Sequence, residues 1–358
     1  MGNQSTSDGF FLATFEYSEH IKVLIFVVLL MIYAFAVLGN GLVAITIAVS
    51  QELHKPMHIL LWNLSIVDII GCTCSVPKQL HILVTGDTGI SKAACVVQAF
   101  CVHSFASMEV LTLAVMAFDR YVAICTPLHY HSVVTNRRSV AVVVVIWTLT
   151  VILLLALNAL IIPMTFADDE KQIQGIFCDN TGIVVHATSD TRTNTSLGSA
   201  LVVFYNGPSM CLIAFTYLRI LTECRKRRSS EFRRKALHTF VTHFLALFMF
   251  FLSVFMVFLI GRFTKDDRSV QTRNTRSIVE LAILVMPVAN VLIYCVRMGE
   301  LRKAMVKVFF PKFFASRNAK THGLSHTTAL LAPSQRDVIA TQKTIVRSNS
   351  IGAPSLSM

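Results

Sequence analysis

Seven long apolar stretches, separated by shorter polar segments, run along most of the chain. A helix needs roughly 20 mainly apolar residues to cross a bilayer, and each stretch reaches that length. We place the stretches at 23–49, 57–83, 96–124, 139–163, 197–222, 236–260 and 277–296. The pattern predicts an all-α membrane protein folded as a bundle of seven transmembrane helices.

The segments at the two ends complete the predicted domain organisation. We expect an extracellular N-terminal tail at 1–22, a transmembrane domain at 23–297, an amphipathic membrane-surface helix at 298–314 and a disordered cytoplasmic tail at 315–358. The surface helix is predicted because basic and apolar residues fall on different faces there. Serines and threonines in the polar tail are candidate targets for kinases, with arrestin as a partner of the modified tail.

Composition supports a membrane protein and indicates its orientation. Of the 358 residues, 54% are hydrophobic and 15% charged, whereas a soluble domain carries about a quarter charged residues. The net charge of +12 would suit nucleic acid, but most of the basic residues flank the spans, and the densest cluster is at 225–235. The positive-inside rule then places the N-terminus outside and the C-terminus in the cytosol. We expect a multi-pass plasma-membrane protein without a nucleic-acid partner.

Two Asn-X-Ser/Thr sequons agree with this orientation. Asn3 lies in the predicted outer tail, and Asn194 lies in the loop between the fourth and fifth spans. We therefore expect both asparagines to carry glycans. A third match at Asn63 falls within a span, where glycosylation is not expected.

Two of the nine cysteines fall in the predicted outer region. Cys95 lies about 37 Å along the third span from Arg120, at a rise of 1.5 Å per residue. Cys178 lies in the loop between the fourth and fifth spans. A disulfide between them would pin that loop over the bundle in an oxidising compartment; the alternative is two free thiols. The cysteine spacing gives no zinc motif.

Two carboxylates are predicted at the same depth inside the bundle. Asp68 and Glu109 each lie about 16 Å from the inner face, and Asn290 falls in the same half. Buried carboxylates cannot both be ionised without a counter-ion. We expect a shared Na⁺ or proton that biases the resting state; alternatively, one carboxyl is protonated and merely hydrogen-bonded. No other cofactor is expected.

The most specific motif is the segment Met116–Cys125, which contains Asp119, Arg120 and Tyr121 and is followed by Thr126–Tyr130. Further matches are Gly39-Asn40, Leu53–Met57, Asn63–Ser65 with Asp68, Trp147, Thr216–Ile220, and Lys235–Thr239 with His243. With these residues the chain resembles odorant (olfactory) receptors of the rhodopsin-like G-protein-coupled receptor family. The segment Tyr130–Thr135 is similar to fish-like members, which would imply water-borne ligands.

The chain departs from the family pattern at the seventh span. Valine follows Asn290 where the family has proline, although Tyr294 is retained. Without that proline the helix is expected to lose a kink at this point. The loop with Cys178 also lacks the additional cysteine pair of the family, and the C-terminal tail is long.

The resemblance implies a switch at the inner end of the bundle. Arg120 would be held at rest by Asp119 and by the inner end of the sixth span, and agonist binding would move that span outward. The opened cleft would bind a stimulatory heterotrimeric G protein, which raises cyclic AMP. The residues that the resemblance assigns to this switch are Asp119, Arg120, Tyr121, Tyr217, His243, Asn290 and Tyr294.

A small-molecule site is expected in the outer half, among the third, fifth, sixth and seventh spans. Its candidate residues are His103, Ser107, Phe251, Phe255, Phe258, Arg262 and Glu280. Arg262 would clamp a carboxylic acid, or would simply extend toward the membrane surface. Glu280 would pair with Arg262 or attract an amine. The phenylalanines would form apolar walls, or would face lipid or pack in the core.

Other functional classes fit less well. A transporter would be expected to show inverted repeats or broken spans. An enzyme would need a converging nucleophile, base or metal set, so no enzymatic activity is expected. The main alternative within receptors is a non-olfactory rhodopsin-like receptor for a small metabolite or amine.

Overall fold

The computed structural model describes residues 9–13, 19–166, 171–226, 248, 250–252, 254–260, 263 and 269–311. It separates into two units, Met1–Arg302 and Lys303–Met358. The first unit contains the long helices, and the second is described only as far as residue 311. The predicted disordered tail therefore lies outside the described residues.

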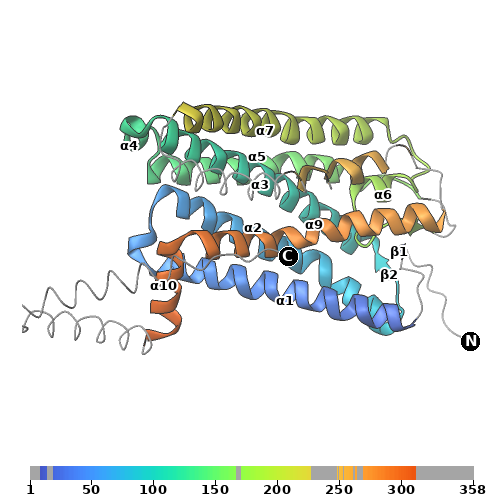
Figure 1. The fold of residues 1–358 in the computed structure, drawn as a ribbon. Helices are drawn as coiled ribbons and strands as arrows, with labels where there is room; N and C mark the ends of the chain where they lie inside the picture. Colours follow the sequence, from blue (N-terminus) through green and yellow to red (C-terminus); the bar gives the residue numbers. More distant parts are fainter. Residues whose placement is uncertain are drawn as a thin grey trace, which may run out of the picture. The chain divides into compact units, whose positions relative to one another are not determined.

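The described residues include six long helices, which form the bundle drawn in Figure 1. They are α1 (Glu19–Val49), α2 (Pro56–Thr85), α3 (Lys92–Cys125), α5 (Asn136–Ala159), α7 (Arg192–Lys226) and α9 (Val270–Arg297). All six are long and apolar enough to cross a membrane. They overlap the predicted spans one to five and seven, although α7 and α9 begin five and seven residues earlier than predicted. Much of the predicted sixth span lies outside the described residues, but Phe250–Ile260 forms a shorter apolar helix.

Helix α3 is central to the bundle because it packs against α2, α5 and α7. The α1 helix packs against α2 and α9. The outward faces of the helices stay apolar: on α5, Val144, Val145 and Ile152 are 57–60% exposed. Such a belt of exposed aliphatic side chains is what a bilayer covers.

The ends of these helices follow from local sequence. Helix α2 begins at Pro56, which suits a first helical turn, and ends at Thr85, where Gly86 caps it with a φ of 74° that favours glycine. Ser91 caps α3 by accepting a hydrogen bond from the Ala94 amide at 3.2 Å. Thr135 caps α5 in the same way, from the Arg138 amide at 3.3 Å.

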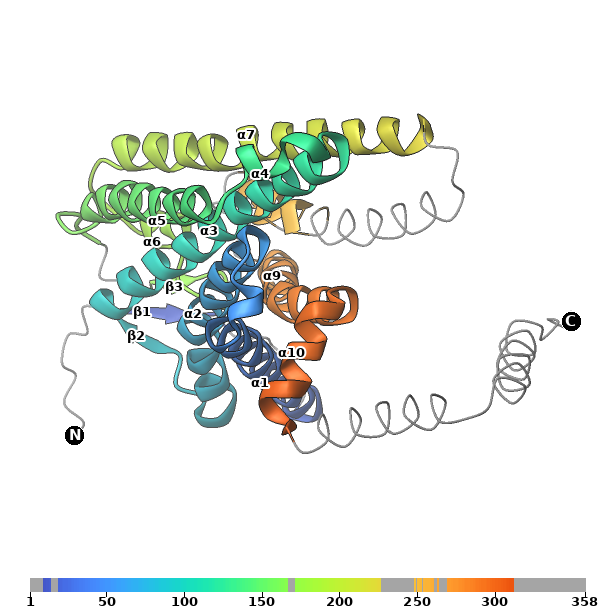
Figure 2. The same cartoon turned by 90° about the vertical axis from the view of Figure 1, so that its left-hand side faces the viewer.

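A small sheet that was not predicted lies at the start of α3 (Figure 2). Strand β1 (Gly9–Leu12) pairs antiparallel with β2 (Gly89–Ser91) and parallel with β3 (Gln172–Ile173). The N-terminal segment was expected to be only a polar tail. Phe10 and Leu12 explain the difference, since both are at most 2% exposed and pack in a core with the cystine.

Short elements complete the described chain. The 3₁₀ turns Gln51–Leu53 and Pro127–His129 and the short helices α4 (Tyr130–Val133) and α6 (Asn180–Val184) lie in connections between the long helices. Helix α10 (Gly299–Phe309) follows α9 and covers most of the segment where the amphipathic helix was predicted.

Candidate functional site

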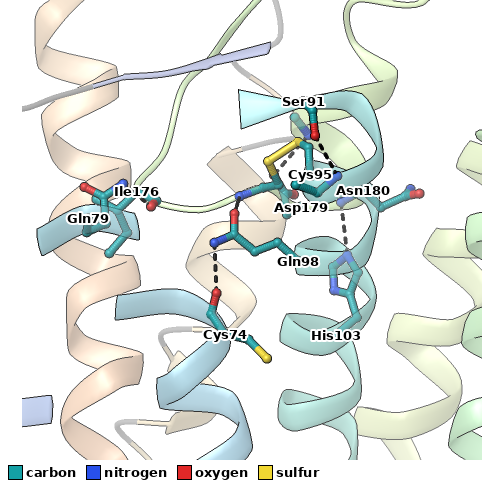
Figure 3. Close-up of a disulfide and its surroundings, with 12 residues drawn as sticks. Cys74, Gln79, Ser91, Cys95, Gln98, His103, Ile176, Asp179 and Asn180 are labelled. Carbon is teal, nitrogen blue, oxygen red and sulfur yellow. Dashed lines mark hydrogen bonds between the residues drawn. A yellow bond between two sulfur atoms is a disulfide. The ribbon is translucent and has the colours of Figure 1, made fainter. Parts of the chain in front are cut away.

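A disulfide fixes the loop between α5 and α7 to the beginning of α3 (Figure 3). Cys95 and Cys178 are joined, with their Cα atoms 5.4 Å apart. Gln98, one turn further along α3, reinforces the attachment: its Oε1 accepts a hydrogen bond from the Cys178 amide at 2.8 Å. Its Nε2 donates to the Cys74 carbonyl on α2 at 3.0 Å. We call this the disulfide end of the bundle.

Helix α6 follows the disulfide directly and is held by side chains from two long helices. Asp179 caps it, accepting from the amides of Thr181 at 3.2 Å and Gly182 at 3.0 Å. His103 on α3 accepts from the Asn180 amide at 3.1 Å, as Figure 3 shows. The Asn180 side chain donates to Asn194 on α7 at 2.8 Å. The position of α6 is therefore set by several directed bonds.

A cavity of about 920 Å³, counting space open to solvent, lies beside α6. Its walls come from α3, α5, α6, α7 and residues 254 and 258. The lining residues are His103, Ala106, Ser107, Leu154, Leu157, Asn180, Thr181, Val184, Val185, Thr195, Gly198, Ser199, Leu201, Val202, Tyr205, Asn206, Val254 and Phe258. Within the described part of the chain, this lining contains hydroxyl, amide and imidazole groups but no Asp, Glu, Lys or Arg. It suits a neutral, partly apolar small molecule.

A buried ion-pair cluster lies close to α6 on the side of α9. The Nη2 atom of Arg276 is 2.5 Å from Oδ1 of Asp179, and its Nε is 2.8 Å from Oε1 of Glu280. Oε2 of Glu280 accepts from the Ile176 amide at 2.7 Å. Neither Arg276 nor Asp179 was singled out in the sequence. The available signal was the spacing of Arg276 and Glu280, four residues apart on a membrane helix.

The two predicted carboxylates meet in the middle of the bundle. Asp68 and Glu109 are both fully buried, and the Nδ2 atom of Asn290 lies 3.2 Å from an oxygen of each. Among the described residues, the second oxygen of each carboxylate has no hydrogen-bond partner. The carboxylates on α2 and α3 and the amide on α9 therefore form one polar layer.

At the opposite end from the disulfide, Asp119 is bonded on both oxygens. Oδ2 accepts from Nε and Nη2 of Arg120 at 2.9 and 2.7 Å, and Oδ1 accepts from the Tyr130 hydroxyl at 2.9 Å. The Asp119 side chain is 2% exposed and that of Arg120 is 45% exposed. Burial, with the neighbouring Asp119 charge, raises the pKa of Tyr130 to about 12. The hydroxyl therefore stays a donor at physiological pH.

Comparison with known proteins decides the family. The model of the olfactory receptor family matches residues 29–312. The chain belongs to the olfactory receptor family. It is similar to human olfactory receptor 2A12, with 32% identity over 312 residues, or 86% of this chain and 97% of the relative. Mouse olfactory receptor 4E2 is 34% identical over 290 residues, which cover 80% of this chain and 90% of the relative.

The fold agrees with this family. The crystal structure of squid rhodopsin superimposes with a TM-score of 0.62 at 17% identity, covering 84% of this chain and 88% of that chain. The predicted seven-transmembrane receptor fold is therefore confirmed. The protein is a multi-pass membrane protein, and its family implies a small-molecule ligand and a G-protein partner. Members of this family are receptors and not enzymes.

Some of the predicted ligand residues reach the cavity of the receptor. His103, Ser107 and Phe258 line it. Phe255 is 55% exposed, and Phe251 packs against a buried cluster around Phe250, so neither is part of the described lining. For these two the alternative roles, facing lipid or packing in the core, fit the structure better.

The charged ligand candidates need revision. Arg262 lies outside the described residues, so its role in binding a carboxylic acid stays a prediction. Glu280 was expected to pair with Arg262 or attract an amine. Instead it is fully buried, binds Arg276 and lies outside the described cavity lining. The physical reason is that α9 begins earlier than expected and supplies its own arginine one turn away.

The glycosylation prediction at Asn194 does not fit the structure. Asn194 is 1% exposed, and its Nδ2 atom, which a glycan would occupy, donates to the Leu157 carbonyl at 3.1 Å. It lies within the first turn of α7, since that helix begins at Arg192, before the expected start of the span. The other predicted site, Asn3, lies outside the described residues.

The proline of the last span occurs at a different position from the family pattern. Helix α9 contains Pro287, three residues before Asn290. The Pro287 carbonyl accepts a hydrogen bond from Asn40 on α1 at 3.2 Å. A proline is therefore present one turn earlier than the expected motif, and Asn40 contacts the backbone there.

The remaining predicted switch residues are placed as follows. Tyr294 is buried, with its hydroxyl 3.9 Å from the Met116 sulfur on α3. The Tyr121 ring contacts that of Phe215 on α7, with centroids 5.7 Å apart. Tyr217 is partly buried on α7. His243 lies outside the described residues.

Proposed function

We propose that this receptor binds a neutral odorant in the cavity beside α6 and activates a stimulatory G protein that raises cyclic AMP. The observation that carries the proposal is the cavity itself, which is walled by the disulfide-held loop and lined by uncharged polar groups. A hydroxyl or carbonyl ligand would find donors and acceptors at Ser107 and Asn206, while leucines and valines cover its hydrocarbon part. Cysteine oxidation and the basic residues at the end of α7 favour an extracellular disulfide end at the plasma membrane.

The Asp119 end supplies the coupling surface in this proposal. The Asp119–Arg120 pair, together with Tyr130, would hold the resting state. Leu128 lies in the adjoining turn and is 94% exposed, which suits an apolar contact with the G protein. The predicted kinase and arrestin sites in the tail belong to the same proposal, although the tail lies outside the described residues.

The polar layer between Asp68 and Glu109 is proposed to hold Na⁺ or a proton in the resting receptor. Support comes from the two oxygens without partners among the described residues, Asp68 Oδ1 and Glu109 Oε2. Two carboxylates that share a single amide, Asn290, need a cation or a proton to balance their charge. The simpler alternative is one protonated carboxyl that serves only to pack the bundle.

A cyclic-AMP reporter cell that expresses the receptor tests the main proposal. We expect responses to medium-chain alcohols, aldehydes or ketones, with weaker responses to matched acids and amines. Ser107→Ala should raise the half-maximal concentration of a responding compound about tenfold, since one buried hydrogen bond is worth roughly 1.5 kcal/mol. The matched control is Ser75→Ala, because the Ser75 hydroxyl donates to the Gly71 carbonyl of its own helix and Ser75 is not among the lining residues of the cavity.

Two outcomes would count against the proposal. Equal loss in the Ser107 and Ser75 variants, at equal surface expression, would show that the cavity is not the ligand site. Responses restricted to acids would favour the Arg262 prediction over a neutral ligand.

A further inference from the structure

The loop segment that closes the cavity is attached to helices on two sides. The disulfide and Gln98 attach it to α3. On the other side, Gln79 of α2 donates to the Ile176 carbonyl, and α9 contributes Glu280 and Arg276. On this second side, the contact through Arg276 leads to α6 because Asp179 caps that helix.

The Arg276 guanidinium bonds two carboxylates through two different nitrogen atoms. Nη2 bonds Asp179 of the loop, whereas Nε bonds Glu280 of its own helix. All three side chains are at most 7% exposed, so water does little to screen them. A lysine is a single point charge and cannot reproduce this two-sided geometry.

Two glycines let the loop backbone lie directly against these carboxylates. A Cβ atom on Gly175 would lie 2.7 Å from Oε1 of Glu280, and one on Gly182 would lie 2.6 Å from Oδ1 of Asp179. Such distances leave no space for a side chain at either position. Movement of either carboxylate would therefore be transmitted to the backbone of the loop.

Asp179 connects the cluster to the cavity. It caps α6 through the amides of Thr181 and Gly182, and both Thr181 and Val184 line the cavity. We propose that Arg276 is a positioning residue for ligand recognition, which acts through Asp179 to fix the α6 wall of the cavity. This inference rests on the proposed function insofar as the cavity is the ligand site.

The first experiment measures the position of α6 without any odorant. Val184 is 7% exposed, so a Val184→Cys thiol should react slowly with a membrane-impermeant methanethiosulfonate reagent applied to intact cells. Adding Arg276→Gln should speed this labelling about tenfold, equivalent to roughly 1.4 kcal/mol, above the background of the parent receptor. Lys78→Gln is the matched control, because it removes an exposed ion pair with Asp87 near the same end.

The second experiment tests recognition with the alcohol, aldehyde and ketone panel. Arg276→Gln should raise the half-maximal concentration at least tenfold and change the rank order of the compounds. The maximal response per surface receptor should be retained, because the Asp119 end is intact. Arg276→Lys should lie between the parent and Arg276→Gln, and it provides the test if the glutamine variant does not reach the surface.

Asp179→Asn completes a double-variant cycle. If Arg276 acts through Asp179, the double variant should shift labelling and the response no further than the stronger single variant. Additive effects would overturn the proposal, as would labelling that Arg276→Gln leaves unchanged. Faster labelling with an unaltered half-maximal concentration would also refute the proposal, since Arg276 would then hold α6 without affecting ligand recognition.

If the parent receptor responds to no compound of the panel, that result counts against the proposed function. The labelling experiment would still decide whether Arg276 holds α6.

Discussion

Removing the Tyr130 hydroxyl should increase the activity of the receptor in the absence of ligand. In Tyr130→Phe, Asp119 keeps its bonds to Arg120 but loses the hydroxyl donor on Oδ1. If this network stabilises the resting arrangement, its loss shifts the equilibrium toward the active state. The ring is retained, so the packing around it changes little.

The size of the effect follows from the surroundings of the bond. A hydrogen bond to an ionised acceptor contributes about 1.5–3 kcal/mol when buried. Tyr130 is only partly buried and the Arg120 side chain is 45% exposed, so water can replace part of the lost donor. We therefore expect about 1 kcal/mol, which corresponds to roughly a fivefold increase in the active fraction.

The assay is ligand-independent cyclic AMP, divided by surface receptor measured in the same cells. Ser132→Ala is a suitable control, since it removes another hydroxyl of the same loop, one that donates to the His129 carbonyl.

The contribution of the Tyr130 hydrogen bond to the resting state is also expected to persist up to alkaline pH. Its raised pKa means that the donor is fully present below about pH 10 and is lost only as the pH rises toward 12. Basal activity that stays unchanged in Tyr130→Phe would refute a latch role for this network.

Three other expectations can be checked separately. In permeabilised membranes, raising the Na⁺ concentration should lower the ligand-independent activity of the parent receptor but not that of Glu109→Gln. An equal response of both receptors to Na⁺ would contradict a shared ion site. Leu128→Ala should reduce G-protein activation severalfold at unchanged surface expression and ligand binding, and normal coupling would rule out this docking contact. Asn194→Gln should leave the glycosidase-sensitive mass of the receptor unchanged but lower its surface expression, because buried hydrogen bonds to Asn180 and Leu157 are disturbed; a loss of mass would show that the site carries a glycan.

The spans were predictable because a bilayer demands about 20 apolar residues from each helix, whatever the helix contacts. The depth of Asp68 and Glu109 was predictable for a related reason: a fixed rise per residue converts position along a helix into height. The structure places both carboxylates within reach of Asn290, as expected for one layer. The disulfide partners were also within the reach of sequence reasoning, because few cysteines fall near that end.

Strand β1 was missed because a strand of four residues has no periodicity that distinguishes it from a loop. Its partners, β2 and β3, lie far away in the sequence. Only the fold brings Phe10 beside Ile90 and Leu12 beside Ile173. The sheet depends on these distant contacts and on burial of its apolar side chains, which a local pattern does not encode.

The errors at Asn194 and Glu280 have a common physical origin. Apolar length locates the part of a helix that faces lipid, so it truncates a helix where polar residues begin. Helices α7 and α9 continue beyond that point, to Arg192 and Val270, and each extension carries a buried polar side chain that bonds the loop. Asn194 and Arg276 were therefore left outside the predicted spans, although they bond Asn180 and Asp179 at the start of α6. The α6 wall of the cavity is held in part by these polar helix ends, which are where comparable contacts should be sought in a related receptor.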